Sequence, residues 1–289
     1  MKKTALILVL LFLFHMIPAQ GEEMGPEEKY LKGQESWNRV IHVLGKDYLV
    51  FAQNSPEWAR MRCNNDSDET LKVHEFACIT FAFANAMVNV VPYRSLPLIT
   101  EIMRYTPKID RYSAAPYQGK RESDRFVITE ECDFPRYWPL TIVSYAAGNN
   151  MDLMDEPTGT FFINTITNYF QVDKTVTTEI DEAFTAMDEG ALALTCFYAD
   201  TTRYGTVGHY FVFAGRDEEY IYMLDSNFMK QYPMPMGGYV ELMEPGLQRI
   251  KIEDLPKLTL GYIFIFRPKE GFEPYTEERY QEILDLSNQ

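Results

Sequence analysis

The sequence has few of the features that mark a metal site or a disulfide scaffold. It contains four cysteines in 289 residues, and no two of them form the Cys-x-x-Cys pair typical of zinc sites. Four cysteines are also few for a fold held together by disulfide bonds. Internal repeats and low-complexity segments do not occur. We therefore expect no cofactor and no metal ion, and a fold that depends on its hydrophobic core.

Basic residues are scarce as well. The chain has 27 Lys and Arg against 42 Asp and Glu, a formal net charge of −15. Such a balance disfavours nucleic acid and anionic membrane as partners and favours solubility. The acidic residues are scattered rather than gathered in blocks, which is typical of a solvated surface.

Long hydrophobic runs are absent too. The unbroken apolar run from Ala5 to Phe14 is too short to span a bilayer, which takes about 20 residues. Lys2 and Lys3 precede it and small residues follow it, the pattern of a secretory signal peptide over residues 1–20. We expect an exported protein, secreted or periplasmic, with no membrane span after signal cleavage.

The remaining chain has ample material for a core, since 46% of its residues are hydrophobic. Its pattern is helix-rich in the first part and strand-rich in the last, which predicts an α+β fold. Residues 76–90 are apolar on nearly all sides, as in a buried central helix. The other elements we expect are a lead-in with a short helix (21–46, helix at 36–44), strands at 48–52, 191–198, 239–242 and 260–266, a helix at 178–187, and a C-terminal helix within 271–289.

Two strand-like runs, 208–215 and 219–225, flank a short polar segment and predict a β-hairpin. If Asp217 is the centre of the loop, His209 and Asp225 lie directly opposite each other, eight residues away on either side. Opposed side chains in an antiparallel pair have Cβ atoms about 4.5–5.5 Å apart. The hairpin therefore predicts a carboxylate that orients an imidazole, two members of a catalytic triad.

Cys78 is the candidate nucleophile. It lies at the expected start of the buried helix, where the positive end of the helix dipole favours a thiolate. A neighbouring base, itself held by a third group, completes the activation of such a thiol. His209 and Asp225 fit these two roles, although a packed core cysteine is the alternative interpretation of Cys78.

Acyl transfer also needs a donor for the developing oxyanion, and a side-chain amide can serve. Gln53 is the candidate, in the turn after the expected strand 48–52. A glutamine of a surface turn is the alternative interpretation.

These parts, in this order, resemble the papain-like family of bacteriocin-processing (double-glycine leader) cysteine peptidases and their stand-alone relatives. The string Gln53-Asn54-Ser55-Pro56-Glu57-Trp58 is similar to the turn that supplies the family's oxyanion glutamine, and Cys78 begins a helix as the family's nucleophile does. Gly208-His209 is similar to the start of the strand that carries the base, and Leu224-Asp225 to the end of the strand that carries the orienting acid.

The resemblance implies a papain-like fold over residues 47–270, with an insertion at about 92–173. It also implies a peptidase acting on peptide or protein substrates, with Cys78 as nucleophile, His209 as base, Asp225 as orienting acid and Gln53 as oxyanion donor. The chain departs from the family's Gly-Cys-Gly-Pro motif, because Ala77 and Ile79 flank the cysteine. It also has no Gly-x-x-x-x-Gly-Lys-Ser/Thr loop, so it is not the peptidase end of an exporter.

Two other functions stay open at this point. The same fold with its mouth closed by Ile79 and the insertion would be a binding module without turnover. A Cys–His–Asp order also serves transglutaminase-like acyl transfer. Of the other cysteines, Cys63 and Cys132 lie in polar loop-like segments and could form a disulfide, whereas Cys196, on an expected buried strand, is a packed thiol.

Overall fold

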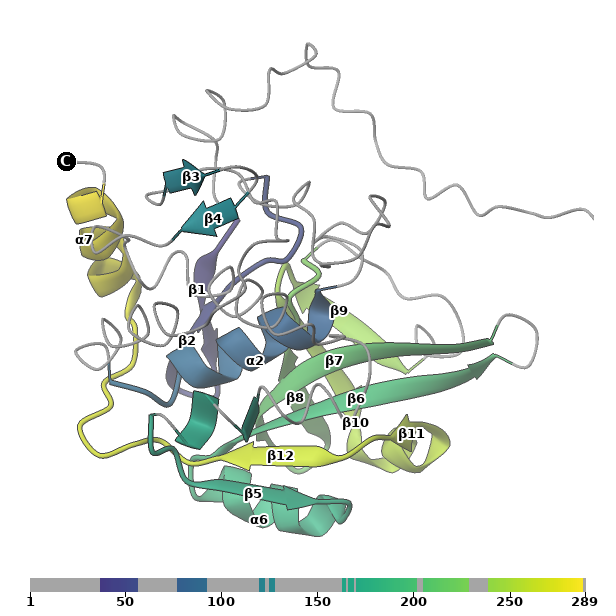
Figure 1. Cartoon of the computed structure of the whole chain (residues 1–289). Coiled ribbons are helices and arrows are strands. Elements are labelled where there is room, and N and C mark those ends of the chain that lie inside the picture. The colour runs from purple at the N-terminus through teal and green to yellow at the C-terminus, as the bar shows by residue number, and fades with distance from the viewer. Residues whose placement is uncertain are drawn as a thin grey trace, which may run out of the picture.

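The computed structural model describes residues 37–56, 77–92, 120–122, 125–127, 163–164, 166–168, 170–201, 205–228 and 239–287. Its elements are shown in Figure 1. In chain order they are β1 (Arg39–Val43), β2 (Lys46–Val50), α2 (Cys78–Val88), β3 (Lys120–Glu122), β4 (Arg125–Val127), β5 (Lys174–Thr177), α6 (Ile180–Asp188), β6 (Leu192–Thr201), β7 (Gly205–Arg216), β8 (Tyr220–Leu224), β9 (Val240–Glu244), β10 (Leu247–Lys251), the 3₁₀ helix η3 (Ile252–Lys257), β11 (Thr259–Leu260), β12 (Ile263–Phe266) and α7 (Glu277–Ser287).

The largest unit is an eight-stranded sheet in the order β5-β12-β6-β7-β8-β10-β9, with β11 paired to β6. Every pairing in it is antiparallel. Two further sheets have two strands each, β1-β2 and β3-β4. The described part of the chain is therefore mixed helix and antiparallel sheet.

Both faces of the large sheet pack against a core cluster. Successive side chains of a strand point to opposite sides, so one strand contributes to both clusters. In β6, Leu192 and Leu194 belong to the core cluster that contains α2 and the β1–β2 hairpin. Their neighbours Ala193 and Phe197 belong to a second cluster, which contains α6. The strand is apolar on both faces for this reason.

Helix α2 lies against β6 and β7 (Figure 1). All eleven of its residues are buried, as its all-round apolar sequence predicts. The predicted helix at 178–187 is also confirmed, as α6, and so is the C-terminal helix, as α7. The strand predicted at 191–198 is β6, and the one at 48–52 corresponds to β2.

The helix predicted at residues 36–44 is wrong. Residues 39–43 form strand β1, which pairs with β2 from Arg39 opposite Val50 to Val43 opposite Lys46. Leu44 and Gly45 between them both have positive φ, +50° and +81°, the conformation of a two-residue hairpin turn. Gly45 thus closes a hairpin rather than ending a helix, and the expected division at residue 46 falls inside it.

Three further differences concern strands. The sequence did not predict β5 or β10, which are short and rich in polar residues: β5 has one apolar residue among four, and β10 has two among five. The single strand predicted at 260–266 is two strands, β11 and β12, which pair with different parts of β6.

Some predictions lie outside the described residues: the signal peptide, most of the insertion at 92–173, Cys63 and Cys132. No helix within the described ranges has both the length and the apolar character needed to cross a bilayer.

Candidate active site

Cys78 is the first residue of α2, as predicted. The helix has no capping side chain at Ala77 and no acidic residue in its first turn. The first backbone N–H groups of the helix therefore have no capping side chain and can bond a group next to the helix start. One of them, that of Ile79, bonds the Cys78 sulfur. A thiolate at this position takes the place of the missing cap and gains from the helix dipole.

His209 and Asp225 come together, but not in the register that the sequence predicted. The last described pairs of the β7–β8 hairpin are Phe213 with Met223 and Val212 with Leu224. Continued by one residue, this register sets Phe211 opposite Asp225. His209 is two residues further along β7, so it reaches the carboxylate diagonally. Its Nε2 nevertheless lies 2.7 Å from Asp225 Oδ1.

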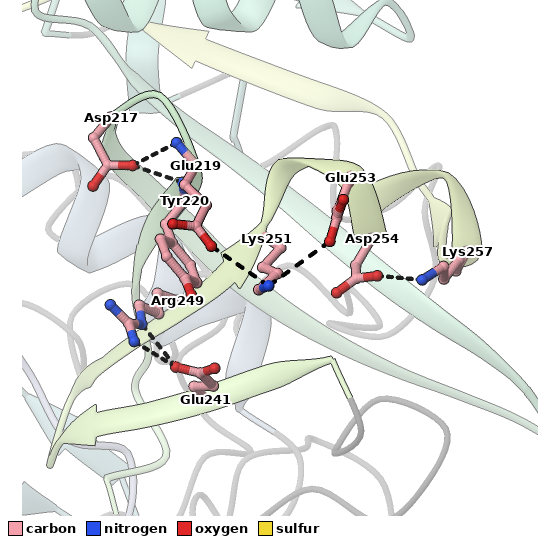
Figure 2. A network of polar contacts seen from close by, with 9 residues as sticks. All are labelled: Asp217, Glu219, Tyr220, Glu241, Arg249, Lys251, Glu253, Asp254 and Lys257. Atoms are coloured by element: carbon pink, nitrogen blue, oxygen red, sulfur yellow. Dashed lines mark hydrogen bonds and ion pairs between the residues drawn. The ribbon is translucent and has the colours of Figure 1, made fainter.

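The error has two sources, of which the first is the loop. The loop is closed by a hydrogen bond from the Asp217 N–H to the Tyr220 carbonyl. Asp217 Oδ1 also accepts the N–H groups of Glu219 and Tyr220, at 2.8 and 2.7 Å (Figure 2). Asp217 therefore begins the turn and is not its centre.

The second source is a β-bulge at Ala214. Near the loop Gly215 pairs with Tyr222, but beyond the bulge Phe213 pairs with Met223. Without the bulge Val212 would face Asp225, and His209 would lie on the other face of the sheet, because a shift of one residue changes the face. The Tyr48 hydroxyl donates to the Ala214 carbonyl at 2.9 Å, which satisfies a group that a bulge leaves unpaired.

The site lies where β7 and β8 part. Beyond Val212, β7 continues beside β6 as far as Gly205, whereas Asp225 follows β10, its N–H donating to the Gly246 carbonyl at 2.9 Å. This fork leaves β7 backbone groups without a β8 partner. One of them, the N–H of Tyr210, bonds the Cys78 sulfur. The start of α2 thus meets β7 where the ladder has ended.

The His209 ring is almost wholly buried, with 6% of the residue exposed. Burial alone lowers its pKa, because an imidazolium loses solvation. The charge and hydrogen bond of Asp225 and the neighbouring Cys78 outweigh this effect and raise the pKa of His209 to about 9. The ring stacks edge-on against Phe211, with centroids 4.7 Å apart. His209 is therefore a positioned and protonated group at neutral pH.

Cys78 shows the complementary shift. Burial raises the pKa of its thiol, but the hydrogen bond and charge of His209, together with the N–H groups of Tyr210 and Ile79, lower it below its usual 9.0. His209 Nε2 is bonded to Asp225, so Nδ1 is the ring nitrogen that faces the thiol. A lowered thiol pKa beside a raised imidazole pKa describes a thiolate–imidazolium pair.

Gln53 is buried and tied to the residue after Asp225. Its N–H donates to the Ser226 carbonyl at 2.7 Å, and its side-chain oxygen accepts the Ser226 hydroxyl at 3.0 Å. The adjacent Asn54 bonds Asn227 at 3.3 Å. These contacts join the turn at 52–55 to the turn at 225–228. They also orient the Gln53 amide, because its oxygen is held toward Ser226.

A ladder of buried asparagines sets Gln53 level with the start of α2. Asn89 bonds both the N–H and the carbonyl of Leu49, and Asn85 bonds both groups of Phe51. Four helix residues advance about 6 Å and two strand residues about 6.6 Å, so each step along the strand matches one helix turn. The next step brings Gln53 to the first turn of α2, which begins at Cys78.

Three polar residues of this site escaped the sequence predictions: Ser226, Asn227 and Gln248. Asn227 donates its N–H to Asp225 Oδ1 at 2.9 Å, and the Gln248 amide donates to Oδ2 at 2.5 Å. A polar run directly after an apolar strand was a signal for the first two. Gln248 had a weaker signal, a single glutamine between Leu247 and Arg249, on a strand that was not predicted.

The side chains of the two residues that depart from the Gly-Cys-Gly-Pro motif are not directed to solvent. Ala77 is 0% exposed and Ile79 is 2% exposed, and both belong to the core cluster around α2. Cys196 is also buried in this cluster, as predicted.

Within the described ranges, no three His, Cys, Asp or Glu residues are placed to hold a metal ion. A scan against known protein families, a search of curated proteins and a search of solved structures each found no match for this chain.

Proposed function

We propose that the protein is an exported, papain-like thiol hydrolase that cleaves amide bonds in peptides or proteins. The observation that carries the proposal is the continuous contact from Cys78 through His209 to Asp225, with the thiol pKa lowered and the imidazole pKa raised. Burying charged groups is costly unless they are paired. A cysteine that only packs in the core does not require a buried histidine and carboxylate beside it, so their presence favours a catalytic role.

In the proposed reaction the Cys78 thiolate attacks the amide carbonyl carbon. The carbonyl oxygen becomes an oxyanion, which the Cys78 N–H and the Gln53 amide stabilise. The His209 imidazolium gives its proton to the leaving nitrogen, and the C–N bond breaks to leave a thioester. Water then attacks the thioester and loses a proton to His209, and release of the acid restores the thiolate–imidazolium pair.

The first test needs no substrate. The rate of Cys78 alkylation by iodoacetamide at pH 7 is measured by peptide mass spectrometry for the wild type and for His209→Ala. We expect the variant to react roughly thirtyfold more slowly, because an ordinary thiol is only a few per cent thiolate at this pH. His42→Ala is the matched control, since His42 is exposed and bonds only Asp47 among the described residues. Equal rates for the wild type and His209→Ala would falsify the proposal.

The second test is hydrolysis of a pool of unstructured peptides, with Cys78→Ala as the inactive reference. A wild type that cuts no peptide although Cys78 is activated supports the second candidate, a binding module on the same framework. The burial of Cys78, 5% exposed, is the observation that favours this candidate. Binding of peptides by Cys78→Ala without turnover by the wild type distinguishes the two functions.

A further inference from the structure

The geometry points to Gln248 as a positioning residue of the site, which holds the Asp225 carboxylate in place. The inference rests on the proposed function, since it concerns how the same thiol is activated. Gln248 lies in β10, opposite Met223 of β8, and it is 1% exposed. Its side chain is on the same face of the sheet as Ile250, two residues along the strand.

Among the described residues the amide of Gln248 has one hydrogen-bond partner, Asp225, and that partner decides its orientation. Asp225 Oδ1 accepts His209 Nε2 and the Asn227 N–H, and Oδ2 accepts the Gln248 Nε2 group. A carboxylate paired with an imidazolium can only accept hydrogen bonds, so the NH₂ end of the amide must face it. The bond to Oδ2 prevents the carboxylate from turning away from His209.

The oxygen of the Gln248 amide indicates that the bond to Asp225 is the reason for a glutamine at this position. Gln248 Oε1 is buried without a partner among the described residues, which is unfavourable for stability. Leucine would fill a comparable space on the face that Ile250 shares, without that cost. A polar side chain at this position therefore stabilises the site at the expense of the core.

The turn before β10 supports the same carboxylate from the backbone. The Gly246 carbonyl accepts the Asp225 N–H. Gly246 has φ of +89°, and a Cβ there would lie 2.8 Å from Ile41 and from Phe228. Only glycine allows this close approach. The β9–β10 hairpin thus fixes both the main chain and the side chain of Asp225.

The titratable groups around this carboxylate are few. His209 of β7 contacts it, and Cys78 of α2 lies beyond His209. Among the described residues, the ion pairs that involve β9 and β10 are Arg39–Glu244, Arg249–Glu241, Lys251–Glu219 and Lys251–Glu253. All four are partly exposed, and none of them includes Asp225.

The test measures Cys78 alkylation by iodoacetamide from pH 5 to pH 9 in three full-length mature variants. Gln248→Leu removes the donor, and we expect a rate roughly tenfold below the wild type, the size of one hydrogen bond to a charged group. Ile250→Val is the control on the same strand and face. We expect it to react like the wild type throughout.

Gln248→Glu gives the readout that a purely structural role would not move. Two carboxyl groups in contact share a proton and titrate as a pair with a raised upper pKa. While it is protonated, the new carboxylic acid still donates to Asp225 Oδ2, and the rate stays close to that of the wild type. As the pH rises and that proton leaves, the rate relative to the wild type falls, whereas the ratio for Gln248→Leu stays constant.

The outcomes separate the two proposals. A wild-type Cys78 that is no more reactive than in His209→Ala overturns both. A reactive wild type with Gln248→Leu unchanged, or with a Gln248→Glu ratio that does not vary with pH, overturns the role of Gln248 alone.

Discussion

Strand β7 has two halves with different surroundings. From Val212 to Arg216 it pairs with β8, and its side chains alternate between two packed clusters. At His209 and Tyr210, β7 no longer pairs with β8. There the His209 side chain and the Tyr210 backbone N–H bond Cys78. The paired half contributes buried apolar area, and the fork contributes hydrogen-bonding groups that contact Cys78 instead of β8. The reactive groups can lie at the fork because the neighbouring hydrogen-bond ladder holds β7 in place.

A sheet can host a buried ion pair at the point where its hydrogen-bond ladder ends. A backbone N–H inside a ladder is already bonded, so it cannot stabilise a thiolate. At the fork the N–H of Tyr210 is released by the departure of β8 and is taken by sulfur. The far end of the same hairpin has a different character. There, Arg249 stacks on the Tyr220 ring at 4.0 Å and bonds Glu241, in an exposed network (Figure 2).

The largest effect is expected from damage to the paired half of β7. Phe213→Ala removes the ring of a residue that is 0% exposed. The centroid of this ring lies 5.9 Å from that of Phe197. We expect a loss of about 3–5 kcal/mol in the free energy of unfolding, measured by urea denaturation. The folded fraction should keep the wild-type rate of Cys78 alkylation. A large loss of that rate with intact stability would contradict the division between the halves.

A smaller loss of stability is expected at the ladder that aligns the fork. Asn85→Leu leaves the buried N–H and carbonyl of Phe51 without their side-chain partners. We expect a loss of about 2 kcal/mol from these two groups, and, unlike at Phe213, a reduced hydrolysis rate because Gln53 moves relative to Cys78. Thermal unfolding and peptide hydrolysis together check it. Unchanged hydrolysis at normal stability would show that Asn85 does not align the site.

The pH dependence sharpens the description of the fork. The pKa of His209 is raised from 6.5 to about 9, so its proton is still present at neutral pH. Hydrolysis, which needs that proton, should fall about tenfold per unit above pH 9, whereas alkylation, which needs only the thiolate, should not fall. A descending limb near pH 6.5 would contradict an imidazolium in the resting site.

The same shifts act on stability with opposite signs. The raised pKa of His209 adds stabilisation that is fully present below pH 6.5 and is lost as the pH rises through about 9. The lowered pKa of Cys78 adds stabilisation that is present above pH 9.0 and is lost as the pH falls through the folded-state value. Urea unfolding of the wild type and of His209→Ala between pH 6 and pH 10 checks the first of these.

The smallest effect is expected in the paired region of β6. The Thr195 hydroxyl is buried and has no partner among the described residues, and the residue pairs with Phe211 of β7. Thr195→Val should raise the free energy of unfolding by about 1 kcal/mol, because an unbonded hydroxyl is costly to bury. Thermal unfolding measures it, and Cys78 alkylation should not change. A destabilised variant would mean that the hydroxyl has a partner.

Local patterns predicted part of this structure well. Helix α2 was predictable because its residues are apolar all round, and β6 because it is apolar on both faces. The β1 segment was not, since Val40, Ile41 and Leu44 fit a helix as readily as a short strand. Leu44 and Gly45 themselves take positive φ because β1 and β2 pair. Gln248 could not be predicted either, because its partner is distant in the chain.

Side-chain polarity and spacing act locally, so the sequence alone indicates which residue types are available and which segments are buried. It named Cys78, His209, Asp225 and Gln53, and it placed Cys78 at a helix start. How these residues come together depends on long-range packing. The bulge at Ala214, held by Tyr48, sets the face that His209 shares with Asp225, and the parting of β7 and β8 opens the place where α2 enters. Both depend on contacts between segments far apart in the chain, which no local pattern encodes.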